Sequence, residues 1–249
     1  MNTEKNGEMT PLKGKRALVT GGAKRIGRGI ALALAEAGAD VAITYRGSRK
    51  EAEQTVGDLE ALGVRAVAVV CDVTEEPSVQ TAVNAVVETL GGLDLLVNNA
   101  GAFETKALEK ISVEEWDAMF ATNTRGPFVV AKAAHAHLKV ARGRIINIGS
   151  LGGIHPWATH GHYCTSKAAV HMLSHVMAKA WAPEISVNCV APGMIVTGEI
   201  NAAYEHFIEK TPMKRNGTVA DVAAGVLFFA TGPDFVTGQL LAVDGGLGL

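Results

Sequence analysis

The chain has few cysteines, and they follow no ligand or disulfide pattern. Its 249 residues include three, Cys71, Cys164 and Cys189, and no Cys-x-x-Cys pair. An odd number of unpatterned cysteines argues against a disulfide framework and against a zinc site. We therefore expect reduced thiols and no bound metal.

The sequence also lacks a long apolar run and an excess of charge of either sign. No apolar run approaches the roughly 18 to 20 residues that a membrane-spanning helix needs, and the polar start has no signal-peptide core. The formal net charge of −2 offers no electrostatic attraction for nucleic acid or an anionic membrane. These absences predict a cytoplasmic protein with neither a membrane nor a nucleic-acid partner.

What the sequence does contain is an alternation of short β-branched runs with longer alanine-rich amphipathic runs. This order is typical of right-handed βαβ units, and runs as apolar as residues 66–70 suit a parallel sheet covered on both faces. Strands are predicted at residues 15–20, 40–45, 65–71, 94–98, 143–149, 185–190 and 239–243. Helices are predicted at residues 26–37, 48–62, 75–90, 112–138, 163–182 and 219–231.

The pattern predicts an α/β fold of one domain over residues 13–249, a doubly wound sheet of seven parallel strands with helices on both faces. With 48% apolar residues, the chain can bury one large core. Residues 1–12 are predicted to be a disordered leader. The stretch 194–217 interrupts the alternation after a strand end, and we predict that it is a lid over a substrate.

A glycine-rich turn joins the first predicted strand to the first predicted helix. Gly21 lets the backbone leave the strand in a tight turn, Gly27 leaves room for a pyrophosphate, and Gly29 lets helix and sheet pack closely. Free N–H groups and the positive end of the helix dipole would then face the phosphates. The turn therefore predicts a dinucleotide site.

The end of the second strand indicates which dinucleotide binds. NAD enzymes usually carry an acid there, about 20 residues beyond the glycine turn, that binds the ribose hydroxyls. This chain has Arg46 instead, and Asp40 lies too early in the strand to reach the ribose. Arg46, assisted by Ser48 and by Lys24 or Arg25, can meet a 2′-phosphate, so the sequence favours NADP (NADPH). An Arg46 that is merely solvated would leave dual specificity.

Tyr163 and Lys167 are four residues apart, so on a helix they share one face. A free tyrosine has a pKa of about 10, and acid–base work near neutral pH asks for a shift of roughly 3 units. A nearby cation favours the phenolate, and Ser150 can donate a hydrogen bond to a substrate oxygen. The three residues can together protonate the oxygen of a carbonyl that receives a hydride, or run the reverse reaction.

The motifs resemble, in order and spacing, those of the short-chain dehydrogenase/reductase family. The resemblance runs from about residue 13 to the C-terminus and rests on Thr20, Gly21, Gly27, Asn98, Asn99, Ala100, Gly101, Asn123, Ser150, Tyr163, Lys167, Pro192 and Gly193. It implies a single-domain Rossmann fold. Because similar proteins form homotetramers, we expect a homotetramer here.

The resemblance also gives residues a role in binding the cofactor. Asn123 would hold a water that links Lys167 to solvent, and Lys167 would bind the nicotinamide ribose. The remaining cofactor contacts would come from Gly21, Lys24, Arg25, Ile26, Gly27, Tyr45, Arg46, Ser48, Asp72, Val73, Asn99, Ala100, Gly101, Tyr163, Pro192, Gly193, Ile195 and Thr197. Among them, Asp72 would bind the adenine amino group, and Ile195 and Thr197 would anchor the carboxamide.

The leading functional hypothesis is an NADPH-dependent reductase of a small-molecule carbonyl, similar to 3-oxoacyl-[acyl-carrier-protein] reductases. The pair Lys24–Arg25 also resembles pteridine reductases, whose active-site serine is often replaced, whereas this chain keeps Ser150. A sugar or polyol dehydrogenase is a third possibility. A non-catalytic nicotinamide sensor, from another class, would be expected to lose one of the four catalytic residues.

Three histidines, His155, His160 and His162, crowd the segment before Tyr163. No carboxylate or cysteine lies at ligand spacing, so we interpret them as surface or pocket-lining histidines rather than as a metal site. His171 is interpreted as a packing residue of the following helix.

Overall fold

The computed structural model describes residues 10–198 and 202–249. The strands are β1 (Arg16–Val19), β2 (Asp40–Tyr45), β3 (Ala66–Val70), β4 (Leu95–Asn98), β5 (Arg144–Ile148), β6 (Ser186–Pro192), β7 (Ile195–Val196), β8 (Gly217–Thr218) and β9 (Leu240–Val243). The helices are α1 (Arg25–Glu36), α2 (Arg49–Ala61), α3 (Glu76–Leu90), α4 (Val113–Phe120), α5 (Gly126–Ala141), α6 (Gly161–Trp181), α7 (Ala202–Lys210) and α8 (Val219–Thr231), with short helical turns η1 (Leu108–Lys110), η2 (Ala121–Arg125) and η3 (Leu151–Gly153).

Seven strands form one parallel sheet in the order β3-β2-β1-β4-β5-β6-β9. Each strand lies within two residues of its predicted bounds. The strand order reverses between β1 and β4, and open α/β sheets bind ligands at such a switch point, outside the carboxyl ends of the strands.

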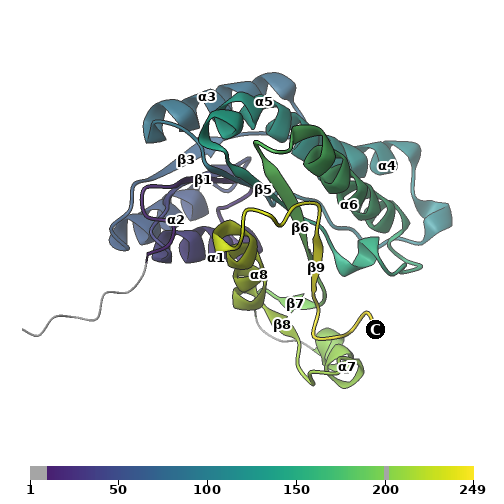
Figure 1. The fold of residues 1–249 in the computed structure, drawn as a ribbon. Coiled ribbons are helices and arrows are strands. Elements are labelled where there is room, and N and C mark those ends of the chain that lie inside the picture. The colour runs from purple at the N-terminus through teal and green to yellow at the C-terminus, as the bar shows by residue number, and fades with distance from the viewer. Residues whose placement is uncertain (1–9, 199–201) are drawn as a thin grey trace, which may run out of the picture.

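The sheet is covered on both faces, which confirms the predicted doubly wound fold. Figure 1 shows α3, α5 and α6 on one face and α1, α2 and α8 on the other. Because side chains alternate along a strand, Val19 and Ile43 enter the core under α1 and α8, while Leu18 and Ala42 enter the core under α3 and α5. All four side chains are buried, as a strand with helices on both sides requires.

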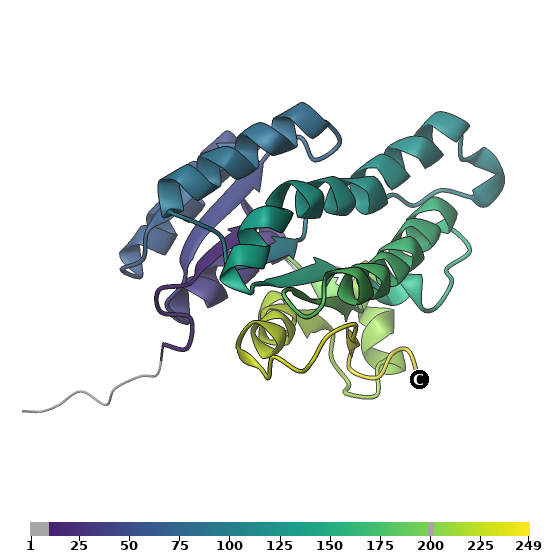
Figure 2. The same ribbon diagram turned by 45° about the horizontal axis from the view of Figure 1, so that its top comes forward.

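The helix predicted for residues 112–138 is present, but it is not α-helical throughout, because a π-helical turn, η2, joins α4 directly to α5. Ser112 caps α4, accepting the Glu115 N–H at 3.2 Å while the Glu115 carboxylate accepts the Ser112 N–H at 2.8 Å. Pro127 in the first turn of α5 has no N–H to continue the hydrogen bonds of α4. The wider turn buries Asn123, and Figure 2 shows α4 and α5 following one another beside α6.

The predicted leader and lid are only partly described. Residues 1–9 of the leader lie outside the described residues, whereas Leu12 is buried and its N–H donates to the Ala37 oxygen at 2.9 Å. The C-terminal end of the predicted disordered leader is therefore part of the fold. In the segment 194–217, β7 pairs with β8, and Figure 1 shows both near α7 at the lower edge of the molecule. Residues 199–201 lie outside the described residues, and closure over a substrate stays a prediction.

Some features are missing from the part of the chain that the structure describes. It contains no helix with the length and apolar character needed to cross a membrane. Within the same residues, no three histidine, cysteine or acidic side chains gather closely enough to hold a metal ion. The three cysteines are free and buried.

Candidate active site

A cleft of about 790 Å³ follows the carboxyl ends of the parallel strands. Every residue predicted to contact a cofactor lines it, from the turn between β1 and α1 to Thr197 beyond β7, and so do Ser150, Tyr163 and Lys167. The volume lies within the range of small-molecule and cofactor sites. The fold thus brings together residues that are far apart in the sequence.

Further residues line the cleft without having been indicated by any motif. They are Thr44, Gly47, Cys71, Thr74, Ala102, Phe103, Thr122, Ile148, Gly149, Trp157 and Met194. Most of them adjoin a predicted residue and follow from the same strand end. Phe103 and Trp157 lie on connecting segments, where strand and helix periodicity carries no information.

The glycine-rich turn is held by side chains from the end of β4. The Asn99 amide donates to the carbonyl oxygens of Thr20 at 2.9 Å and Gly21 at 3.1 Å. The Thr20 hydroxyl accepts the N–H groups of Asn99 and Ala100, both at 3.0 Å. A Cβ at Gly27 would collide with the Gly21 oxygen and the Asn99 amide, so the close approach that requires this glycine is to the turn itself.

Gly29 has a different neighbour from the one predicted. A Cβ there would collide with Val219 at the start of α8, not with the sheet. The small residue therefore brings two helices together on one face of the sheet, which fixes α1 behind the cleft.

Two cations stand where α1 begins. Lys24 and Arg25 are exposed and line the cleft beside the first free N–H groups of α1. Arg25 has a φ of +52°, a left-handed conformation that costs a non-glycine residue roughly 1 to 2 kcal/mol. An arginine kept in this conformation at the mouth of a cleft points to a function for its side chain.

The end of β2 carries the charge pattern that the sequence predicts. Arg46 is largely exposed, with Nη1 3.5 Å from Asp72 Oδ2. The other Asp72 oxygen accepts the Thr74 N–H at 2.9 Å and the Thr74 hydroxyl at 2.7 Å, and these bonds, more than Arg46, lower the pKa of the carboxyl. Asp40 lies at the opposite end of β2 and binds Arg65 at 2.8 Å, as its place at the start of the strand predicts.

Ser150 is positioned by its own backbone and by the next helix. Its Oγ accepts the Gly152 N–H at 3.0 Å, and its backbone N–H donates to His171 Nε2 at 3.3 Å. Burial lowers the pKa of His171 to about 4, so the ring stays neutral and able to accept. His171 therefore does more than pack, and the Ser150 hydroxyl, hydrogen bonded to Tyr163, faces the cleft.

The pKa of Tyr163 is not lowered, as the sequence predicts, but raised. Burial raises the pKa of Tyr163, and the hydrogen bond with Ser150 acts only partly against it. The Lys167 ammonium is buried and donates to the Ile148 oxygen at 2.8 Å, and burial lowers its pKa to about 8. At neutral pH the site therefore holds a protonated phenol close to a positively charged lysine.

Asn123 lies behind the wall of the cleft rather than in its lining. Its amide donates to the Ala102 oxygen and the Ser166 hydroxyl, both at 3.0 Å, and its Oδ1 accepts the Ala102 N–H at 2.7 Å. A Cβ at Gly101 would lie 3.3 Å from Asn123 Oδ1 and 3.6 Å from Lys167 Nζ. Asn123 and Lys167 thus border the same small space, which glycine keeps open.

The histidines before Tyr163 have separate environments. His162 is fully buried with no hydrogen bond to either ring nitrogen, and Glu104 Oε2 lies 3.6 Å from its Nε2. The interpretation of His162 as a surface or pocket-lining residue is therefore wrong. His160 instead exchanges hydrogen bonds with Thr105 at 2.9 Å and Thr159 at 3.0 Å.

Known proteins match this chain along nearly its full length. The sequence model of a family described as enoyl-(acyl carrier protein) reductase matches residues 21–248. The 3-oxoacyl-[acyl-carrier-protein] reductase FabG of Staphylococcus epidermidis is 38% identical over 240 residues, which are 94% of this chain and 98% of that protein.

Solved structures agree with this match. A short-chain dehydrogenase from Burkholderia cenocepacia J2315, crystallised in complex with NADP, is 40% identical with a TM-score of 0.91, covering 96% of this chain and 100% of that one. A blue fluorescent protein from a metagenomic library, in complex with NADPH, is 38% identical with a TM-score of 0.90 over the same shares of the two chains.

Proposed function

The chain belongs to the short-chain dehydrogenase/reductase family, and we propose that it is a reductase that converts a carbonyl to an alcohol with NADPH. The observation that carries the proposal is the convergence of Ser150, Tyr163 and Lys167 at one end of a cleft whose other end carries three cations, Lys24, Arg25 and Arg46. A panel of 3-oxoacyl thioesters, pterins, quinones and sugars, followed by NADPH absorbance, tests it. No turnover of any of them would contradict the proposal.

The side chains divide the chemistry between them. A nicotinamide cofactor bound in the cleft supplies a hydride to the carbonyl carbon. Ser150 donates a hydrogen bond to the carbonyl oxygen, and Tyr163 delivers the proton that this oxygen gains. The positive charge of Lys167 stabilises the phenolate that Tyr163 becomes, and its ammonium would also bind the ribose.

The residues of the cleft fit NADP(H). Arg46 is exposed at the end of β2, and Ser48 directly precedes the N-terminus of α2, where an anion is favoured. Arg46 also neutralises Asp72, which would otherwise repel a 2′-phosphate. The NADP and NADPH complexes of the Burkholderia and metagenomic relatives support the same choice.

Arg46→Asp tests the choice between NADPH and NADH. The change removes a favourable charge and places a carboxylate beside Asp72, so it acts against a 2′-phosphate, while a carboxylate can accept from free ribose hydroxyls. We expect the NADPH/NADH ratio of kcat/KM to fall by at least about tenfold. Steady-state kinetics with both cofactors measures it, and an unchanged ratio assigns the discrimination to Lys24, Arg25 or Ser48. Lys13→Asp, at an exposed lysine before β1 and so at the end of the sheet away from the cleft, is the control.

Arg25→Gly separates the conformational role of residue 25 from its charge. Glycine relieves the positive φ but is more flexible when unfolded, so the free energy of unfolding should stay within about 1 kcal/mol of the parent. The lost cation should weaken NADPH binding by about tenfold, as for one charge-assisted hydrogen bond. Denaturant unfolding and NADPH fluorescence titration are the measurements. Arg25→Ala keeps the strained φ of the parent, so it should lose the same affinity with little change in the free energy of unfolding. Full affinity in both variants would exclude contact with the cofactor.

For the substrate we propose a 3-oxoacyl thioester, as in the FabG relatives. The 38% identity over nearly the whole chain supports this class. The second candidate is a pterin, because the Lys24–Arg25 pair resembles that of pteridine reductases. The retained Ser150 favours ordinary carbonyl chemistry, and the substrate panel separates the two.

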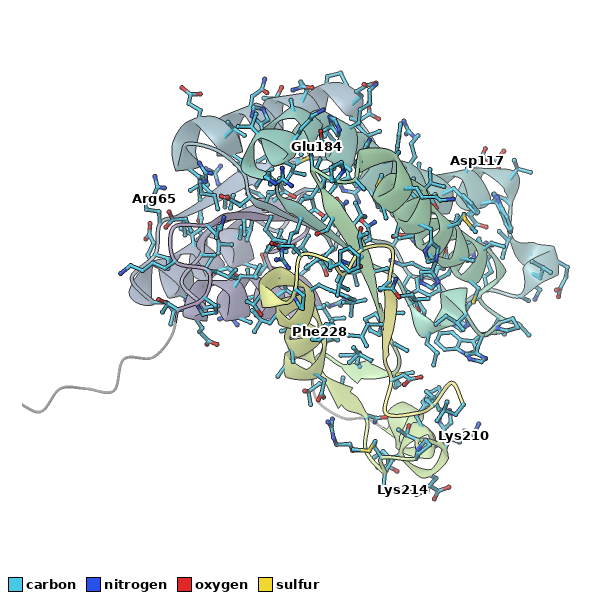
Figure 3. The ribbon with its side chains drawn as sticks, in the orientation of Figure 1. Arg65, Asp117, Glu184, Lys210, Lys214 and Phe228 are labelled. Carbon is cyan, nitrogen blue, oxygen red and sulfur yellow. The ribbon has the colours of Figure 1, made fainter. Side chains whose placement is uncertain are left out.

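We also propose a homotetramer, because apolar side chains stand exposed on outer helices. Phe128 on α5 is 44% exposed, and Met172 on α6 is 62% exposed. Phe228, labelled in Figure 3, is 53% exposed on α8, which lies on the face of the sheet opposite α5 and α6 (Figure 1), so two separate surfaces are available. Light scattering on the purified protein tests the assembly, and a monomer at micromolar concentration would contradict it.

A further inference from the structure

Two aromatic side chains stand in the cleft beside the reacting tyrosine. The ring of Phe103 lies edge-to-face on Tyr163, with centroids 4.9 Å apart and an interplanar angle of 85°. Phe103 also lies 5.0 Å from the ring of His160, and Trp157 lies 5.6 Å from that ring at 74°. Phe103 and Trp157 both line the cleft. We call these two rings, with His160 between their loops, the aromatic slot.

The slot is held in place before any ligand binds. His160 is hydrogen bonded through both ring nitrogens, to Thr105 at 2.9 Å and to Thr159 at 3.0 Å. The Lys106 N–H donates to the Thr159 oxygen at 2.8 Å, in a short parallel bridge between residues 106 and 160. These bonds tie the segment that carries Phe103 to the segment that carries Trp157. Little conformational freedom is then lost when a ligand enters.

The charges of the cleft lie away from the slot. Among the described residues that line the cleft, Lys24, Arg25, Arg46 and Asp72 follow β1, β2 and β3, at the cofactor's adenosine end. Lys167 is the exception, and its ammonium donates to the Ile148 oxygen.

The other residues that line the cleft near the slot are also uncharged. Ala102 and Met194 line the same cleft. Burial and the neighbouring His162 lower the pKa of His160, so this ring is neutral at neutral pH. A sugar or a charged substituent would leave polar groups unpaired in such surroundings, whereas a flat apolar group would not.

We propose that the substrate carbonyl carries an aromatic or conjugated planar substituent, which packs in the cleft against Phe103 and Trp157 while the oxygen faces Ser150 and Tyr163. This substrate class rests on the proposed carbonyl reduction and narrows it. A 3-aryl-3-oxoacyl thioester is a 3-oxoacyl thioester that also carries such a planar substituent, and its ring and its thioester lie on opposite sides of the reacting carbonyl. Aromatic rings gain from edge and face contacts that a saturated ring of the same size lacks.

The test compares two substrates that differ only in this ring. They are the N-acetylcysteamine thioesters of 3-oxo-3-phenylpropanoate and 3-cyclohexyl-3-oxopropanoate, with acetophenone and cyclohexyl methyl ketone as the pair without a thioester. Phenyl conjugation itself slows hydride addition, so the informative quantity is the phenyl/cyclohexyl ratio of kcat/KM in each variant relative to the parent. The intrinsic reactivities cancel in that comparison.

Phe103→Leu and Trp157→Leu should each lower the phenyl/cyclohexyl ratio several-fold, and the double variant by about tenfold. Phe103 is 62% exposed, so its replacement leaves the core intact, and Phe103→Tyr should restore the ratio. Phe235→Leu, at a fully exposed phenylalanine, is the matched control. Turnover with the parental ratio in every variant overturns the aromatic slot and leaves carbonyl reduction standing. No turnover of any of the four compounds overturns the aromatic slot, and carbonyl reduction falls with it only when the wider panel of thioesters, pterins, quinones and sugars also shows no turnover.

Discussion

Tyr163→Phe is expected to lower turnover by about 10²-fold or more while NADPH binding stays nearly intact, because the change removes only the hydroxyl that we propose as the proton donor. The phenyl ring keeps its edge-to-face packing on Phe103, so the shape of the cleft is preserved. What disappears is the hydroxyl that is hydrogen bonded to Ser150. The measurements are kcat at saturating NADPH and the NADPH dissociation constant by fluorescence. Turnover within a few-fold of the parent, on a substrate that the parent reduces well, would remove Tyr163 from this role.

The pH profile supplies the control for Tyr163. Burial raises the pKa of its phenol, so the protonated form that reduction needs persists through and above neutral pH. Oxidation of an alcohol needs the phenolate and should therefore rise with pH. The phenylalanine variant should lose this opposite pH dependence of the two directions, whereas a variant that merely disturbs folding would keep it.

Much of the fold and of this site follows from local sequence patterns. The strands were predictable because apolar β-branched runs alternate with amphipathic ones, and the site lies where those strands end. Ser150 follows β5, and Tyr163 and Lys167 share one face of α6, so position along the chain was enough to bring them together. The place of Arg46 in the cleft was predictable for the same reason, because Arg46 directly follows β2.

Other features depend on tertiary contacts that no local pattern encodes. The spacing of Tyr163 and Lys167 does not reveal how deeply the phenol is buried, which is why a lowered tyrosine pKa was expected and a raised one was found. The turn that buries Asn123 is stabilised by the Ala102 backbone, and His162 is buried beneath residues from another segment. Phe103 and Trp157 belong to loops, where hydrophobic periodicity predicts no side-chain position.

Lys167→Met should affect both cofactor binding and chemistry, because we propose that its one buried ammonium serves both. The charge stabilises the phenolate formed during reduction, and its loss should lower kcat/KM by about 10²-fold or more, the scale of one preorganised electrostatic contact. NADPH should bind more weakly, because the ribose loses a donor. Lys132→Met, at an exposed lysine of α5 that pairs with Glu76, is the control and should leave both quantities unchanged.

The pH dependence identifies the ammonium itself as the active group. Burial lowers the pKa of Lys167 from 10.5 to about 8, so the parent should lose reductive activity as the pH rises through about 8 and the charge disappears. The methionine variant has no proton to lose there, and its profile should lack this limb. The variant should fold at least as stably as the parent. Because burial lowers the pKa of Lys167 to about 8, the charged lysine destabilises the folded state below that pH, and methionine removes this destabilisation. A fall in maximal rate with unchanged NADPH affinity would contradict the dual role, and a variant that keeps the limb near pH 8 would assign that limb to another group.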